Sequence, residues 1–176
     1  SVLEDLIRTI CTTNCGFSAT RRMLETMVSS LGDPASAVTR QAFPTAQQIV
    51  DAGPRFFRDQ TRAGYRADYI VSIASRVSRN QVDLEELRPG TASDLTDDDV
   101  RDRLLDLPGV GPYAASHIMM LMGRHSYPVL DSWSRPAYAH VVGGTVTDKN
   151  IVERFSHLGR HAGLAFWLVV TRAWFD

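Results

Sequence analysis

The chain has 176 residues, of which 44% are hydrophobic and 22% charged, which is the balance of a globular protein with a buried core. Its net charge of −1 argues against a protein that holds nucleic acid through a general positive field, but permits a local grip on a few phosphates. The sequence contains no run of 18 apolar residues, so no membrane-spanning segment is predicted, and its first residues lack the pattern of a signal peptide.

Apolar residues recur at three- and four-residue spacing through the first half of the chain, which predicts helices. Gly32 is expected to close the second helix, and Gly53, followed by proline, is expected to end the third. The predicted helices of this half cover about 3–10, 23–31, 45–50 and 65–77. Residues 88–96 resemble a connecting loop and mark the most plausible boundary between two lobes.

The second half continues the helical pattern. Thr96 and Asp99 have the spacing of a helix-opening box, with aspartate in place of glutamate. The predicted helices cover about 99–105, 112–122, 131–142, 148–158 and 163–175. No window alternates long enough to predict a strand. We therefore expect an all-α fold with two small helical lobes around a cleft, forming one domain over residues 1–176.

The most informative stretch is LPGVGPYAA, at residues 107–115. Gly109 and Gly111 permit positive φ and bring bare backbone to the surface, and Pro112 suits the first position of the outgoing helix. The backbone N–H groups of Gly109, Val110 and Gly111 are expected to point toward an anion such as a phosphate of duplex DNA. A tight helix–helix connection without a ligand is the alternative.

Asp131 lies 18 residues beyond Tyr113, within the segment YPVLDSW. It stands where it could cap the next helix. An ionised carboxylate held near C1′ of a nucleoside would also stabilise the positive charge that develops as the C–N bond breaks, and could deprotonate the attacking water. The two roles are compatible. Pro136, five residues further on, is a departure that could displace or kink this helix.

The hairpin followed by this aspartate resembles the helix-hairpin-helix superfamily of base-excision DNA glycosylases. The segments at 10–15, 64–70 and 163–167 look like the alkylpurine and oxoguanine branches, so the resemblance covers the whole chain. It implies a helix-hairpin-helix at about 99–122, a catalytic Asp131, and duplex DNA from which a damaged base is flipped. It also implies a monomer, in the cytoplasm with the nucleoid or in the nucleus.

In the superfamily's bifunctional members, a lysine two residues after the second hairpin glycine attacks the sugar and leads to strand cleavage. That position is Tyr113 here, and a phenol cannot form an imine. Lys149 is the sole lysine of the chain and matches no motif. The resemblance therefore implies a monofunctional glycosylase in which water is the nucleophile. No cysteine follows Cys15, so no iron–sulfur cluster is expected.

Other candidate residues have two interpretations each. Tyr113 and Trp133 could line the pocket of the flipped base, or could pack within the protein. Asn14 lies in the first helix–helix connection, from which related enzymes fill the gap left by the base, and could equally cap a helix. Cys11 and Cys15 are expected to be reduced thiols.

The resemblance also implies a monovalent cation, Na⁺ or K⁺, held by backbone carbonyls of Leu105, Leu107 and Val110. The substrate is expected to be an alkylated purine, then oxidised guanine, then uracil or thymine in a mismatch. The alternative function is a helix-hairpin-helix module that binds DNA without catalysis.

Overall fold

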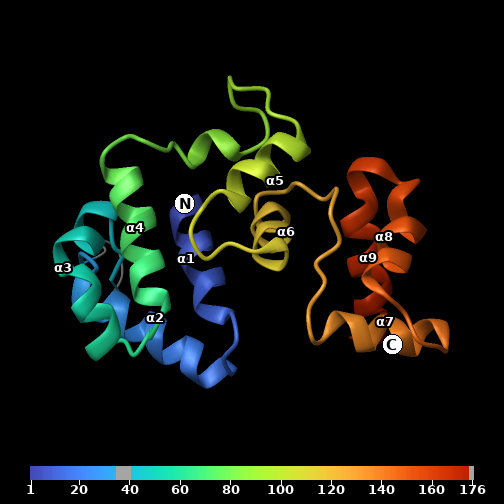
Figure 1. Ribbon diagram of the computed structural model, residues 1–176, viewed down its shortest axis with the longest axis horizontal. Coiled ribbons are helices and arrows are strands. Elements are labelled where there is room, and N and C mark those ends of the chain that lie inside the picture. The colour runs from blue at the N-terminus through green and yellow to red at the C-terminus, as the bar shows by residue number, and fades with distance from the viewer. Residues whose placement is uncertain (35–40, 175–176) are drawn as a thin grey trace. The chain divides into compact units, whose positions relative to one another are not determined.

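The computed structural model describes residues 1–34 and 41–174, and over these ranges it is built from helices, with an isolated bridge between Pro34 and Gln41 (Figure 1). The all-α prediction is confirmed. The chain divides into two compact units, one of Ser1–Glu86 with Asp106–Val110, the other of Leu87–Leu105 with Gly111–Asp176. Within the described ranges, every helix is too short or too polar to cross a membrane.

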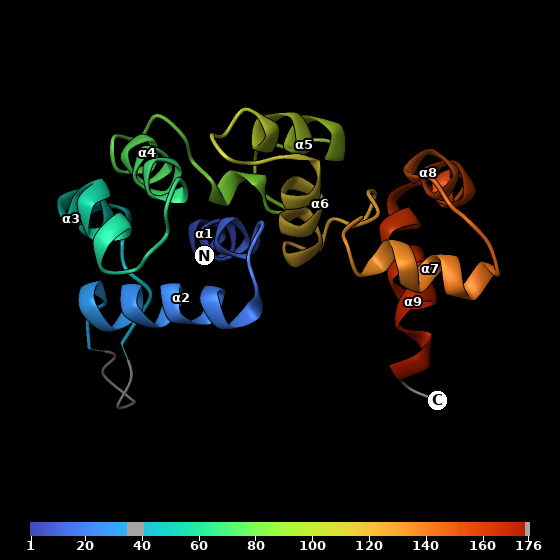
Figure 2. The ribbon, with the colours of Figure 1, turned by 60° about the horizontal axis from the view of Figure 1, so that its bottom comes forward.

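The first unit is a group of four α-helices followed by a short turn of 3-10 helix. They are α1 (Val2–Thr12), α2 (Phe17–Leu31), α3 (Ala46–Asp59) and α4 (Arg66–Ser78), and η1 (Glu85–Leu87) lies at the boundary, with Leu87 in the second unit. In Figures 1 and 2, α3 lies beside α4 and α1 beside α2. Their apolar stripes meet in a core whose fully buried side chains include Leu6, Ile7, Met27, Ile49, Phe57, Ile70 and Ile73.

The third helix is longer than its sequence pattern predicts. A helix at 45–50 that ends at Gly53 was expected, but α3 continues to Asp59 across a kink at Gly53, where φ is 68°. Pro54 follows the kink and opens the second part, where a missing N–H costs little. The expected end is therefore a bend, and it brings Phe57 into the core.

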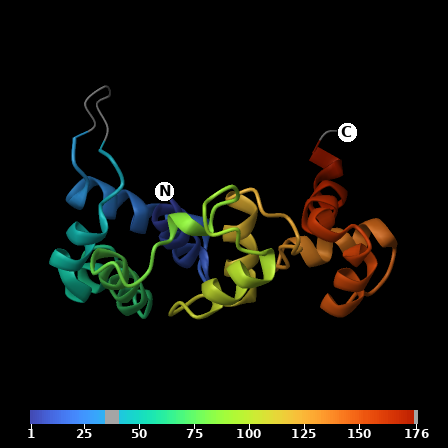
Figure 3. The same cartoon turned by 90° about the horizontal axis from the view of Figure 1, so that it is seen from above.

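The second unit contains the remaining helices. They are α5 (Asp97–Leu105), α6 (Pro112–Leu121), α7 (Ser134–Val142), α8 (Asp148–Ser156), η2 (Gly159–His161), α9 (Ala162–Thr171) and η3 (Arg172–Trp174). In Figures 1 and 3, α7, α8 and α9 stay grouped. Tyr138, Phe155 and Phe166 hold this group together, with ring centroids 5.6–5.7 Å apart.

The ends of the helices follow the local sequence. The Asp99 carboxylate accepts hydrogen bonds from the backbone and hydroxyl of Thr96, and Thr96 accepts one from the Asp99 N–H, so the predicted opening box is confirmed. Gly143, with φ of 72°, ends α7 as expected. Pro136 lies in the first turn of α7, where N–H groups have no intrahelical acceptor, so it fits there without a kink.

Candidate functional site

The turn between α5 and α6 is shaped by a contact with α4. Gly109 has φ of 80°, and a Cβ at this position would overlap the ring of Tyr69. Both the backbone conformation and the space therefore require glycine here. The Arg76 side chain donates to the carbonyl of Asp106 at 3.4 Å and ties the turn to the same helix.

Gly111 differs from Gly109. Its φ of −97° and ψ of −179° are extended, and a Cβ there would meet nothing within 4 Å. The positive φ that both glycines permit is adopted by Gly109 and not by Gly111. Pro112 is the first residue of α6, as predicted.

The predicted N–H donors of the turn are not equivalent. The Val110 N–H is used internally, because it donates to the Leu107 carbonyl at 3.2 Å. The N–H groups of Gly109 and Gly111 find no acceptor among the described residues, and both glycines are exposed. The start of α6 therefore presents donors that a bound anion could satisfy.

Asp131 is held by the segment that follows it. Its Oδ1 accepts hydrogen bonds from the backbone N–H groups of Trp133 at 2.9 Å and Ser134 at 2.6 Å. The Asp131 N–H in turn donates to the Ser134 hydroxyl at 2.9 Å, and that hydroxyl donates to the Val129 carbonyl at 2.9 Å. Ser134 is buried, so its hydrogen bond to the Val129 carbonyl is shielded from water. The predicted capping role is confirmed.

The second carboxylate oxygen of Asp131 takes no part in the hydrogen bonds that cap the helix. Oδ2 has no partner within the ranges the structure describes, and Asp131 is only partly buried. The pKa of Arg135 is raised mainly by its hydrogen bonds to Asp148, with a smaller contribution from the charge of Asp131. A carboxylate with one oxygen fixed and one open suits a water molecule or a developing cation.

The rings of the three tryptophans of the chain form a cluster. One of them, Trp133, lies two residues after Asp131 in the sequence. The ring of Trp133 lies 5.9 Å from that of Trp167 and 5.1 Å from that of Trp174. Trp133 is 40% exposed and Trp174 is 62% exposed, so the cluster opens to solvent. The alternative that Trp133 is simply buried is excluded. The sequence singled out Trp133 alone, because the convergence of α7, α9 and η3 is a tertiary feature.

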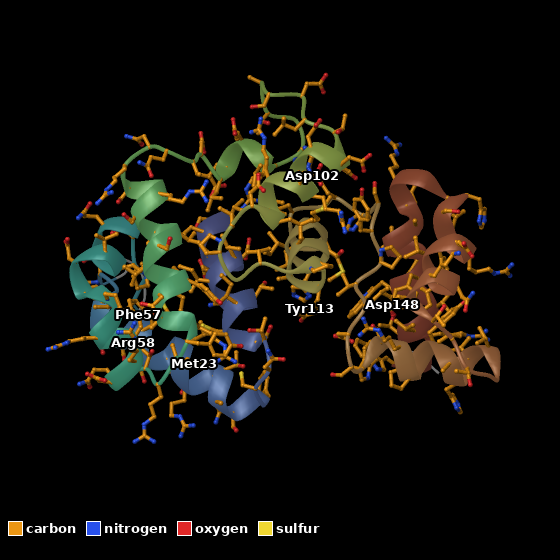
Figure 4. All side chains as sticks on the ribbon, in the orientation of Figure 1. Met23, Phe57, Arg58, Asp102, Tyr113 and Asp148 are labelled. Atoms are coloured by element: carbon orange, nitrogen blue, oxygen red, sulfur yellow. The ribbon has the colours of Figure 1, made fainter. Side chains whose placement is uncertain are left out.

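Tyr113 and Lys149 occupy different helices. Tyr113 is half-buried on the first turn of α6 (Figure 4), and its ring lies 5.7 Å from that of His117. Lys149 lies on α8 with its side chain 82% exposed, 3.7 Å from Glu153 one helical turn away. The sole lysine is therefore a surface residue of an ordinary ion pair.

Asn14 lies in the connection between α1 and α2, as predicted, with φ of 48°. Its side-chain amide donates to the hydroxyl of Tyr65 at 3.2 Å, which lowers the pKa of that phenol. Buried Arg66 donates to the Thr13 carbonyl and stacks its guanidinium 4.6 Å from the Tyr65 ring centroid. Tyr65, which is exposed, was not identified from the sequence as a candidate, although it lies in the segment 64–70 that resembles the glycosylases.

The remaining candidates concern metals and thiols. Cys11 and Cys15 are free thiols, and burial raises the pKa of Cys11 to about 12. No group of histidine, cysteine and carboxylate side chains that could hold a metal ion occurs in the described part of the chain. The Leu107 carbonyl accepts one hydrogen bond, whereas those of Leu105 and Val110 accept none from described residues. Free carbonyl oxygens fit a hard monovalent cation.

No family model matches the chain. An N-glycosylase/DNA lyase of Saccharomyces cerevisiae is 27% identical over 163 residues, which are 88% of this chain and 42% of that protein. The apo 8-oxoguanine glycosylase/lyase of Clostridium acetobutylicum superposes with a TM-score of 0.79 at 23% identity, over 97% of this chain and 60% of that one.

A 3-methyladenine DNA-glycosylase from Archaeoglobus fulgidus superposes with a TM-score of 0.73 at 22% identity, over 100% of this chain and 60% of that one. The chain thus shares the fold of these proteins, and the glycosylase resemblance seen in the sequence is confirmed at the level of the fold. It spans less than half of the yeast relative's length.

Proposed function

We propose that this chain, whose fold is that of the helix-hairpin-helix DNA glycosylases, hydrolyses the N-glycosidic bond of a damaged base flipped out of duplex DNA. The observation that carries the proposal is the Asp131 carboxylate, with Oδ1 fixed by two backbone N–H groups and Oδ2 open. Capping uses Oδ1 alone, so the free Oδ2 remains available for chemistry.

In the proposed reaction, the N–H groups of Gly109 and Gly111 hold a backbone phosphate. The flipped nucleotide brings C1′ close to Oδ2 of Asp131, whose charge stabilises the cationic sugar as the C–N bond breaks. A water oxygen then bonds to C1′, and its proton passes to the carboxylate. The base leaves with the bond's electron pair, so the products are free base and an abasic site.

The proposed enzyme is monofunctional, although the yeast and clostridial relatives are named as lyases. Strand cleavage by their route needs an amine that condenses with the opened sugar. Tyr113 stands where related lyases carry that lysine, and Lys149 is paired on the surface of α8. Water is therefore the proposed nucleophile.

The proposed substrate is an alkylated purine. Trp133, Trp167 and Trp174 beside Asp131 offer electron-rich rings, which attract the positive charge that alkylation places on a purine. Oxidised guanine is the second candidate. A monovalent cation on the carbonyls of Leu107 and Val110, with Leu105, would add positive charge beside the gripped phosphate, and we propose it for that role.

The test of catalysis is base release from duplexes that each carry one lesion. After incubation with the protein, alkali cleaves any abasic site, and the products are resolved by length. Cleavage of a 3-methyladenine or 7-methylguanine duplex supports the proposal. If no lesion in a panel of alkylated, oxidised and deaminated bases is released while the duplexes still bind, the chain is a DNA-binding module without catalysis.

The test of monofunctionality is borohydride trapping. The wild-type protein should leave no covalent adduct on DNA and should yield cut strands only after alkali. Tyr113→Lys supplies the missing amine and should give a trapped adduct. Efficient trapping by the wild type that disappears in Lys149→Ala would show that a lyase is present and that its lysine has moved.

A further inference from the structure

The second unit contains a cavity of about 580 Å³ that the proposed reaction does not use. The loop before α5, the loop after α6 and the η2 turn form its walls. It lies at the C-terminal end of α6, whereas Gly111 caps the N-terminal end, about 15 Å away for a ten-residue helix. An occupant of the cavity would therefore be separate from the phosphate at the hairpin.

Arg124 forms a rigid part of the cavity wall. Its side chain is only 10% exposed. Nε donates to the Leu87 carbonyl at 2.8 Å, and Nη1 donates to the Leu95 carbonyl at 3.0 Å and to Asp97 at 2.6 Å. Its charge is thereby neutralised and its position fixed. Nη2 has no acceptor among the described residues, so one fixed donor is unused.

One further side chain on the wall has unused donors. Arg160 donates through Nε to the ring of His161 at 3.1 Å, and neither of its terminal nitrogens has a partner within the described ranges. A ligand that supplies oxygen acceptors would pair with these nitrogens.

The acidic side chains at the cavity are mostly engaged. Asp97 accepts from Arg124 and from the Ser126 hydroxyl. Asp98 accepts from the hydroxyl of Tyr127, and burial, with that contact, raises the pKa of Tyr127 to about 12, so the phenol stays a donor. The charge of Asp97 is therefore neutralised by Arg124, and Asp98 is the acidic side chain on the wall whose charge opposes an anion.

We propose that this cavity binds the phosphate group of a small molecule. Its oxygens would accept from the terminal nitrogens of Arg160 and from Nη2 of Arg124. The volume exceeds that of phosphate and lies in the range of small-molecule sites. Pro89 and Leu95 offer apolar wall to an organic part. The proposal does not depend on glycosylase activity.

Calorimetric titration of the chain with adenosine 5′-monophosphate, inorganic phosphate and adenosine tests this site. Both phosphates should bind and adenosine should not. Arg160→Ala should weaken phosphate binding about tenfold or more, because a charge-assisted pair is lost. Arg154→Ala, an equally exposed arginine on α8, should have no effect. Asp98→Asn should tighten binding, because it removes the opposing charge.

The outcomes separate the sources of the phosphate. Tighter binding of the nucleotide than of inorganic phosphate assigns the cavity to a phosphate monoester, and equal binding assigns it to free phosphate. Equal binding of adenosine and its monophosphate, an equal effect of the Arg160 and Arg154 variants, or no heat at millimolar ligand would overturn the proposal. The titration contains no DNA, so these failures leave the glycosylase proposal untouched.

Discussion

The hairpin turn at 106–111 and the Asp131 segment at 129–134 are built by different means. The turn depends on a helix much earlier in the chain, because Gly109 lies against Tyr69 of α4. The Asp131 segment depends on itself, since its hydrogen bonds join residues no more than five positions apart. Two segments, one encoded locally and the other dependent on a distant helix, should respond differently to substitutions.

The largest expected effect is on chemistry at Asp131. Asp131→Asn should lower single-turnover base release about 100-fold or more, because the charge that stabilises the transition state is lost. The fold should persist, because asparagine is as good a capping residue as aspartate and its amide oxygen can keep the bonds of Oδ1. Release is measured under excess enzyme, with DNA affinity and melting temperature measured in parallel.

Asp148→Asn is the matched control. Asp148 also lies at the start of a helix (Figure 4) and interacts with the same Arg135. It should release base at close to the wild-type rate. Near-wild-type release by Asp131→Asn, or an equal loss in both variants, would contradict the catalytic assignment.

The next largest effect is expected at the hairpin glycine Gly109. Gly109→Ala should destabilise the fold and weaken DNA binding by about 1–3 kcal/mol, through strain at positive φ and overlap with Tyr69. Gly111→Ala should leave stability within about 0.5 kcal/mol, because its backbone is extended and its surroundings are open. Chemical denaturation measures stability, and titration with damaged and undamaged duplexes measures affinity.

The Gly109 effect can be divided into its two causes. Tyr69→Ala in the Gly109→Ala background removes the overlap but leaves the backbone strain, so it should recover part of the loss. No recovery would mean that the ring contact is unimportant. A loss of affinity confined to one lesion would point to the base pocket and contradict a backbone grip that ignores sequence.

The locally encoded features could be predicted from the sequence. Three helix ends depend only on residues a few positions away, so a short stretch of sequence suffices to recognise them. They are the pair Thr96 and Asp99 at the start of α5, Asp131 before α7, and Gly143 at the end of α7. The helical periodicity likewise depends on neighbours in the chain. The all-α architecture followed from such signals together with the hairpin motif.

Features that depend on distant residues could not be predicted. The meeting of Trp133 with Trp167 and Trp174 requires the packing of three segments. The distinction between Gly109 and Gly111 requires knowing what lies against each, because a G-x-G pattern treats them alike. Gly53 followed by proline has the sequence of a helix end and, once packed, is a kink.

Ser134→Ala tests the locally encoded Asp131 segment, and its expected effect is smaller than that of Asp131→Asn. It removes the acceptor of the Asp131 N–H and a buried donor to the Val129 carbonyl, so stability should fall by about 1–2 kcal/mol. Base release should fall less than in Asp131→Asn, and not further in the double variant, if Ser134 acts by positioning the carboxylate. Ser132→Ala, exposed and two residues earlier, is the control and should be neutral in both measurements.

The smallest effect is expected at the surface pair of Arg135 and Asp148, which are 2.6 Å apart and each more than 40% exposed. The hydrogen bond from Arg135 lowers the pKa of Asp148 below the usual 3.8. The unfolded chain therefore binds this proton at higher pH than the folded chain does. The pair stabilises the fold above pH 3.8, and this contribution is lost as pH falls through the lowered pKa of Asp148.

Because the pair is exposed and screened by salt, Asp148→Asn should cost about 0–1 kcal/mol of stability at neutral pH. The difference between wild type and variant in urea denaturation should stay constant from pH 7 to 5 and shrink below pH 3.8; a difference that grows on acidification would contradict this sign.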